Sequence, residues 1–434
     1  MASDIRLLRI HPRPDREHTR TPPSIPAPAP PRIPVMQLWQ PQIPDRYYAL
    51  SSEDIADAIS ARREQLASDL IILGHHYQTD EVIRHADFTG DSLKLSQLAA
   101  EEVQRRGAKY IIFCGVHFMA ESADLLAPEG TSVILPDLSA GCSMADMADY
   151  EDAVEAWDTM HQTLAGMGWK GRIIPITYVN SSAAIKAFVG ARGGVCCTSG
   201  NAMRVFEWAL KGGTKPAKKN EDIKLLFLPD QHLGRNTSAA HGIDVANRAP
   251  LYDPRQTRKG EPLGGMTPEQ LLDAKAILWA GHCSVHKLFR PEHCDELRAT
   301  DPDMTIMVHP ECSKEVVDKS DITGSTEAII ETIEQAPPGS RWGVGTEIHL
   351  VNRLAKAAAE RGVFVRILSD CQCLCTTMYR IDEPHLLWVL DHLIQGKVLN
   401  RVQVHPEARG PALESLHRML ALADRKAIGA KTSA

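Results

Sequence analysis

The sequence predicts an α/β protein made of three similar units, each a three-layer αβα domain with a parallel sheet. Buried-strand patterns alternate with helical patterns along the body of the chain. The same order of strands, turns and helices can be read three times. Each reading closes on a cysteine that follows an apolar run, at Cys142, Cys283 or Cys375. Three equivalent cysteines converge if the three units pack pseudo-symmetrically around one axis.

The composition is that of a globular protein, with 434 residues of which 43% are hydrophobic and 24% are charged. A net charge of −7 predicts no basic surface for nucleic acid. No apolar run approaches the roughly 20 residues of a membrane span, and charges stand where a signal peptide would be apolar. Ten cysteines without a secretion signal indicate a reducing compartment. We therefore expect a cytoplasmic protein that binds neither nucleic acid nor membranes.

The chain before the repeat consists of an arm and one helix. Residues 1–47 are rich in proline and predict an extended or disordered arm. The pattern of 51–69 predicts a helix with Ser51 or Ser52 as its N-cap. The predicted domains are 48–150, 151–290 with a surface insertion at 238–268, and 291–382, while helices within 383–428 are expected to pack back on the first domain.

Each unit begins with an apolar strand that ends in polar residues, at 70–78, 172–180 and 304–312. A small turn then opens a helix, at 87–100, 195–209 and 321–333. A second strand and loop follow, at 110–126, 223–238 and 341–358. The strand that carries the cysteine comes last, at 132–142, 274–283 and 363–375.

The spacing supports this register. The distance in sequence from the serine of the turn to the cysteine is 50 residues in the first and third units, from Ser92 and Ser325. It is 84 residues in the second unit, from Ser199. The excess in the second unit matches one polar stretch, which we interpret as the surface insertion.

The three repeated cysteines are candidate metal ligands. Three thiolates do not fill a tetrahedral zinc site, but they can hold an iron–sulfur cluster with one iron left open as a Lewis acid. The third ligand is ambiguous. We prefer Cys375, which Thr-Thr-Met follows, although Cys371 and Cys373 could be a spare ligand or a redox pair. We expect the remaining cysteines to be buried and inert, at Cys114, Cys196, Cys197, Cys294 and Cys312.

Zinc is a weaker interpretation. The string from His282 through Cys283 to His286 resembles a zinc-binding segment, but its spacing does not match a zinc finger.

Polar residues follow the first strand of every unit, where parallel sheets bind ligands. These residues are His75, His76, Tyr77 and Gln78 in the first unit, Tyr178 and Asn180 in the second, and His309, Pro310 and Glu311 in the third. The turns at 90–92, 198–201 and 324–326 predict helix N-caps that can also bind carboxylates or phosphate. No Walker or dinucleotide-binding motif is present.

The motifs together resemble the quinolinate synthase family, the iron–sulfur enzymes of de novo NAD biosynthesis. The matching segments cover about 70–390 in order and include GHHYQ, DFTGDSLKLSQ, CGVHFMAESA, SAGCSMAD, TYVNSSAAIKA, CCTSGNA, LPDQHLGRN, GHCSVH, HPEC, GSTEAII, GTEIHLVNRL and CLCTTMYRID. The resemblance implies three pseudo-symmetric αβα domains around one [4Fe–4S] cluster per chain, held by Cys142, Cys283 and Cys375.

The resemblance also implies an activity, the condensation of iminoaspartate (iminosuccinate) with dihydroxyacetone phosphate to give quinolinate, phosphate and water. An aspartate-oxidising enzyme could supply the iminoaspartate. The substrate site would be lined by His75, Ser92, Tyr178, Val179, Asn180, Ser199, His309, Pro310, Glu311 and Thr326.

The expected mechanism uses an open iron to polarise a substrate hydroxyl for departure. We expect Glu311 and His309 to transfer protons, and Tyr77 and His75 to position or protonate the triose phosphate carbonyl. Tyr178 is included with these catalytic residues. The alternatives are an aconitase-like hydro-lyase of another dicarboxylic acid, and an iron–sulfur sensor or electron carrier.

Overall fold

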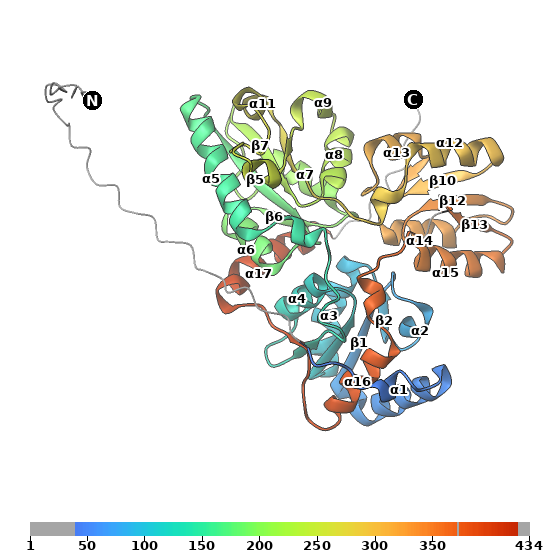
Figure 1. Cartoon of the computed structure of the whole chain (residues 1–434). Helices are drawn as coiled ribbons and strands as arrows, with labels where there is room; N and C mark the ends of the chain where they lie inside the picture. The colour runs from blue at the N-terminus through green and yellow to red at the C-terminus, as the bar shows by residue number, and fades with distance from the viewer. Residues whose placement is uncertain (1–39, 371–372, 424–434) are drawn as a thin grey trace, which may run out of the picture. The chain divides into compact units, whose positions relative to one another are not determined.

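The computed structural model of the chain describes residues 40–370 and 373–423, which form three sheets with helices packed against them (Figure 1). The predicted α/β class with three parallel-sheet units is confirmed. Of the predicted arm, 1–39 lies outside the described residues, as does Cys371. Ile43 and Tyr47 are buried, so the folded body begins before residue 48.

The first sheet contains β1 (Leu70–His75), β2 (Phe88–Gly90), β3 (Tyr110–Cys114), β4 (Ser132–Ile134) and β14 (Arg401–Val402). The second contains β5 (Gly171–Tyr178), β6 (Val195–Cys197), β7 (Asp222–Leu228), β8 (Leu251–Tyr252) and β9 (Ala276–Trp279). The third contains β10 (Thr305–Val308), β11 (Ile322–Thr323), β12 (Arg341–Gly345) and β13 (Phe364–Ile367).

The strand order is the same in the three sheets. It runs β2-β1-β3-β4 in the first, β6-β5-β7-β9 in the second and β11-β10-β12-β13 in the third, all in parallel pairs. In each unit the chain therefore crosses from the first strand to a strand on one side of it, and then to a strand on its other side. Ligands bind in such sheets at the carboxyl ends of the strands where the order reverses. In this chain the reversal lies beside β1, β5 and β10, the strands whose ends carry the predicted polar residues.

The helices repeat in the same way. Short helices follow the first strands, at α2 (Asp80–Ile83), α6 (Ala183–Ala191) and α13 (Lys314–Lys319). The next helices are α3 (Ser92–Arg106), α7 (Ala202–Leu210) and α14 (Thr326–Glu334). Helices α4 (His117–Leu126), α8 (Gln231–Ala240) and α15 (Ile348–Ala359) follow the second strands. Three-residue 3-10 helices follow the cysteines, at η3 (Ala145–Met147), η4 (His286–Leu288) and η5 (Met378–Arg380).

Helix α1 (Ser52–Leu66) precedes the first unit, and α5 (Tyr150–Gly166) and α12 (Pro291–Thr300) lie between the units. The side chain of Ser51 accepts the backbone N–H of Asp54, so one of the two predicted N-caps of α1 is confirmed. None of the described helices is both long and apolar enough to cross a membrane.

The strands β2, β6 and β11 are absent from the sequence prediction, which treats these residues as turns. Each is two or three residues long and pairs with the first strand of its unit. So few residues show no periodicity, and only the pairing partner makes them strands.

The stretch at 238–268 contains α9 (Val245–Arg248), the edge strand β8 and α10 (Pro254–Thr257), and α11 (Pro268–Asp273) follows it. The stretch does not lie wholly on the surface. Tyr252 of β8 is buried and its ring packs on Trp279 with the centroids 5.0 Å apart. The insertion therefore extends the second sheet and part of its core.

The C-terminal segment contacts two of the three units. Helix α16 (Glu383–Leu393) packs on α1, and β14 pairs antiparallel with β4, so both belong with the first sheet. Helix α17 (Pro406–Ala421) instead packs against α6 and β6 of the second unit and also contacts α4. This differs from the expectation that the whole segment returns to the first domain.

The packing of α17 on α6 depends on one glycine. A Cβ at Gly190 would overlap the carbonyl oxygen of Pro411 in α17. We expect Gly190→Ala to lower the free energy of unfolding by about 1–3 kcal/mol, because the helices would have to separate. Gly166→Ala is the control, since nothing lies within 4 Å of the added Cβ. Thermal unfolding of the two variants measures the difference, and equal melting temperatures would contradict the prediction.

Candidate active site

One cavity is lined by residues from all three units. It contains every residue of the predicted site except Pro310, whose carbonyl oxygen accepts a hydrogen bond from Asn236. The predicted residues that line it are His75, Tyr77, Ser92, Tyr178, Val179, Asn180, Ser199, His309, Glu311, Thr326 and the cysteines Cys142, Cys283 and Cys375. Side chains that lie more than 200 residues apart in sequence thus share one cavity.

Backbone hydrogen bonds show which cysteines are equivalent in the repeat. In each unit, the first residue of the helix after the second strand donates its N–H to the carbonyl oxygen two residues before a cysteine. The pairs are His117 to Ala140 at 2.8 Å, Gln231 to Gly281 at 2.9 Å and Ile348 to Cys373 at 3.1 Å. Cys373 therefore occupies the place of Ala140 and Gly281, and Cys375 is the counterpart of Cys142 and Cys283.

Each of these cysteines precedes a 3-10 helix. In each unit the carbonyl oxygen of the cysteine accepts the N–H of the residue four positions later, at 3.1 Å. The thiols face backbone N–H groups of the same turns, those of Ala145, His286 and Met378. Such N–H groups stabilise a sulfur that carries negative charge.

The three cavity cysteines are also the only partly exposed ones among the described residues, and the others are buried. Cys373 is 0% exposed and belongs to the core of the third unit. Burial matches the inert role predicted for Cys114, Cys196, Cys197, Cys294 and Cys312.

The thiols need a positive partner to ionise in this cavity. Burial raises the pKa of Cys142 to about 12, and it also raises the pKa values of Cys283 and Cys375. A negative charge on Cys375 would raise the pKa values of Cys142 and Cys283 further. A metal centre supplies the missing positive charge. Three converging thiols fit a [4Fe–4S] cluster that keeps one iron free of protein ligands.

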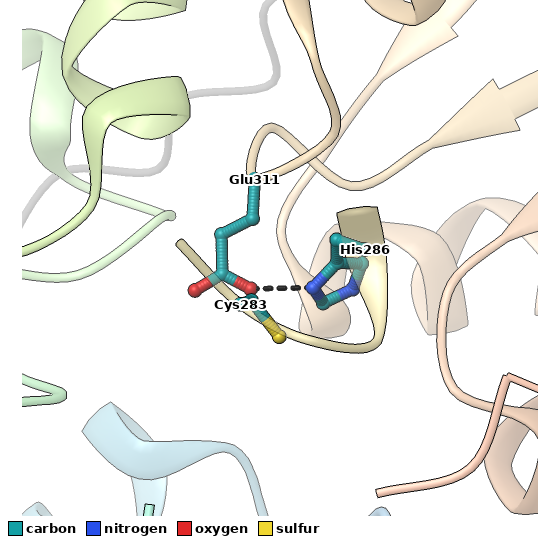
Figure 2. A group of neighbouring side chains, drawn as sticks. All are labelled: Cys283, His286 and Glu311. Atoms are coloured by element: carbon teal, nitrogen blue, oxygen red, sulfur yellow. Dashed lines mark ion pairs between the residues drawn. The ribbon is translucent and has the colours of Figure 1, made fainter. Parts of the chain in front are cut away.

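Cys283, His286 and Glu311 form a tight group within this site (Figure 2). Their ligand atoms all lie within 4.8 Å of one another, and Nδ1 of His286 lies 2.6 Å from Oε2 of Glu311. The other ring nitrogen of His286 lies 3.1 Å from Oγ1 of Thr346. Because both nitrogens face protein groups, the histidine is placed to carry a proton rather than to bind a single metal ion.

A buried chain of polar groups continues from His286 to the cavity. Thr346 Oγ1 lies 3.0 Å from the hydroxyl of Tyr77, which lies 3.1 Å from Oγ1 of Thr326. Tyr77 can donate to Thr346 and Thr346 to the ring of His286, and the ion pair at Nδ1 links His286 to Glu311. The carboxylate of Glu311 is thereby connected to the Tyr77 hydroxyl.

The buried groups keep defined protonation states. Burial lowers the pKa of His309 to about 3 and holds that of His75 well below its usual range, so both imidazoles are neutral near pH 7. Burial raises the pKa values of Tyr77 and Tyr178, so both phenols stay protonated. Burial alone would raise the pKa of Glu311, but the neighbouring His286 and His309 lower it. Glu311 is thus the ionised base among neutral donors.

His286 and Thr346 are the functional candidates whose roles the sequence prediction missed. The repeat contains a signal for them. His286 stands where the other units have Ala145 and Met378, and Thr346 stands where they have Gly115 and Pro229. A polar residue at a position that is otherwise apolar or small marks a departure from the repeated scaffold.

The cysteine loops contact one another across the units. Arg380, just after Cys375, donates to Oγ of Ser139 at 2.6 Å and pairs with Asp137 at 3.3 Å in the Cys142 loop. The indole of Trp279, before Cys283, donates to the carbonyl oxygen of Met147 at 2.6 Å. These contacts fix the relative positions of the three loops.

Comparisons with known proteins agree on one family. A profile of the family described as quinolinate synthetase A protein matches residues 57–421. A quinolinate synthase of Acidobacterium capsulatum is 50% identical over 376 residues, which are 87% of this chain and 95% of that protein. One of a Nocardioides species is 52% identical over 375 residues, 86% of this chain and 90% of that protein. One of Rhodopirellula baltica is 43% identical over 414 residues, 93% of this chain and 98% of that protein.

Proposed function

Because the chain belongs to the quinolinate synthase family, we propose that its cavity condenses iminoaspartate with dihydroxyacetone phosphate, giving quinolinate, phosphate and water. The observation that carries this proposal is the joint lining of one cavity by three equivalent cysteines and by the polar strand ends of all three units. Quinolinate is the precursor that this family supplies to NAD biosynthesis.

The cluster ligands in this proposal are Cys142, Cys283 and Cys375. When bound, a [4Fe–4S] cluster supplies an open iron that acts as a Lewis acid toward a substrate hydroxyl. Every other role belongs to side chains and backbone groups of the chain itself.

Substrate anions are held by the helix ends that reach the cavity. Ser92 and Thr326 are the first residues of α3 and α14, and Ser199 precedes α7. Helix N-termini present free N–H groups and the positive end of the helix dipole, which suit carboxylates and phosphate. Three such ends match a pair of substrates that together bear two carboxylates and one phosphate.

Proton transfer is assigned to Glu311 and Tyr77. Glu311 accepts protons during tautomerisation and dehydration, and the chain through His286 and Thr346 fixes the position of the Tyr77 hydroxyl. Tyr77 stays a protonated phenol and is the proton donor of the pair. Neutral His75 and His309 and the phenol of Tyr178 can each donate a hydrogen bond to the substrates.

The supply of substrate is a further part of the proposal. Iminoaspartate is expected from an aspartate-oxidising enzyme, and a reducing, cytoplasmic setting suits the thiols of Cys142, Cys283 and Cys375.

The test is an anaerobic assay with iminoaspartate in the presence and absence of dihydroxyacetone phosphate. We expect quinolinate and inorganic phosphate in equal amounts only when both substrates are present. Dehydration of a dicarboxylic acid without phosphate release would instead indicate the aconitase-like reaction and would overturn the proposal.

The proton chain predicts the effect of Thr346→Val. Valine keeps the shape of threonine but breaks the link between His286 and Tyr77. Loss of one buried hydrogen bond costs about 1–3 kcal/mol. Added to the activation free energy, this cost lowers kcat about 10- to 100-fold and leaves KM nearly unchanged. Thr237→Val is the control, because this buried hydroxyl donates only to the carbonyl oxygen of Leu233 within its own helix. Equal kcat values for the two variants would contradict the chain.

A further inference from the structure

Two buried carboxyl groups, Asp230 and Glu347, occupy equivalent places beside the cysteine loops. Asp230 is the N-cap of α8 and Glu347 is the N-cap of α15, and both are 0% exposed. The same place in the first unit, before α4, is occupied by Val116. Neither acid is among the residues that line the cavity, so substrate contact does not account for them.

Asp230 uses both of its oxygens. Oδ1 accepts the backbone N–H of Leu233 at 2.7 Å, which caps α8. Oδ2 accepts the backbone N–H of Cys283 at 3.2 Å. Its neighbour Gln231 donates to the carbonyl oxygen of Gly281 at 2.9 Å. The chain leading to Cys283 is therefore bonded to the start of α8 at two successive points.

Glu347 occupies the matching N-cap in the third unit. Oε2 accepts the N–H groups of His349 at 2.8 Å and Leu350 at 3.2 Å, which caps α15. The other oxygen, Oε1, is buried and has no hydrogen-bond partner in the described part of the chain. Ile348 donates to the carbonyl oxygen of Cys373, as Gln231 does to Gly281.

Helix capping alone does not require a carboxyl group at these two places. Asparagine caps a helix as well as aspartate does, and burying a carboxylate without a cation is costly. Within the described residues, neither acid forms an ion pair with a lysine, arginine or histidine. In Asp230 the second carboxyl oxygen is the acceptor that faces Cys283, whereas an amide has a single oxygen.

We propose that Asp230 and Glu347 are positioning residues for the metal centre, which fix the backbone of Cys283 and Cys375 so that their thiols hold the cluster. The inference rests on the proposed ligand set. The first unit has no such carboxyl group beside its cysteine, because the equivalent residue is Val116, whose side chain has no acceptor. The loop of Cys142 is held instead through Asp137, which accepts the N–H of Ser139 at 2.8 Å.

The test compares Asp230→Asn with the wild-type protein, both reconstituted anaerobically with iron and sulfide. The amide oxygen keeps the cap of α8, while its NH₂ group faces the N–H of Cys283 and cannot accept it. We expect a chelator to remove iron about 10- to 100-fold faster from Asp230→Asn, the usual effect of removing a partner of a metal ligand. Glu347→Gln should behave in the same way, and both should alter the electron paramagnetic resonance spectrum of the reduced cluster.

Asp149→Asn is the control, because Asp149 caps α5 through the N–H groups of Glu151 and Asp152 and accepts no N–H of a cysteine in the described part of the chain. It should release iron at the wild-type rate. Thermal unfolding of the cluster-free proteins should be similar for all three variants, which separates cluster positioning from loss of the fold. Wild-type rates of iron release in Asp230→Asn and Glu347→Gln would overturn the inference. Failure of the wild-type protein itself to bind a cluster would instead overturn the proposed function.

Discussion

Anaerobically reconstituted Cys375→Ala protein should lose the cluster and all measurable quinolinate formation. The wild-type protein should bind about four iron atoms per chain. Loss of a residue that hydrogen-bonds to a metal ligand lowers metal affinity about 10- to 100-fold, and loss of a ligand itself should lower it further. The physical reason is that burial holds the remaining thiols protonated unless a complete centre compensates their charge. Iron per chain, visible absorbance and product formation measure the effect.

The matched control is Cys373→Ala, two residues away. The side chain of Cys373 is fully buried in the core of the third unit and does not line the cavity. Its replacement should lower stability by about 1 kcal/mol through a small cavity and leave iron content unchanged. Cys142→Ala and Cys283→Ala should match Cys375→Ala. If Cys373→Ala lost the cluster and Cys375→Ala kept it, the assignment of the third ligand would be wrong.

Glu311→Gln should keep the cluster and lose turnover, with kcat lower by about 10²- to 10⁴-fold. Glutamine has nearly the same shape but cannot accept a proton, and it removes the negative charge that attracts the proton of His286. The chain that positions the Tyr77 hydroxyl then loses its anionic end. Single-turnover assays together with iron content separate this loss of proton transfer from loss of the metal centre.

Glu383→Gln is the control for this substitution. Glu383 is also a buried acid whose oxygen lies 2.6 Å from a histidine nitrogen, that of His85, but it belongs to the contact of α16 with the first unit. Its replacement should lower the free energy of unfolding and leave kcat unchanged. Normal turnover in Glu311→Gln would remove Glu311 from the catalytic residues.

Much of the site could be predicted because its residues repeat. Cys142, Cys283 and Cys375 stand at equal places in three similar segments, and the strand-end polar residues mark the edge where parallel sheets bind ligands. The third ligand could not be settled from spacing, since Cys373 and Cys375 both follow the same strand. The hydrogen bond from Ile348 to Cys373 fixes the register and leaves Cys375 as the equivalent cysteine.

Other parts of the site could not be predicted, since they depend on contacts between units. His286 and Glu311 lie in different units, and Thr346 meets Tyr77 across 269 residues of sequence. In the sequence Asp230 is indistinguishable from an ordinary helix cap, and only the structure shows that its second oxygen accepts the N–H of Cys283. The short strands β2, β6 and β11 were missed for a different reason, because pairing within each unit and not periodicity defines them.

The sequence by itself determined the fold class and the threefold repeat, because strand burial, helix starts and repeat spacing are local properties. Nearly all of the site residues that it predicted line the cavity. Only the tertiary structure decided which third cysteine is equivalent, where α17 packs, and how Glu311 is connected to Tyr77. Those outcomes depend on distances between residues that are far apart in the chain, and no local pattern encodes such distances. The three cysteines therefore needed both kinds of information: repetition identified them, and packing brought them to one cavity.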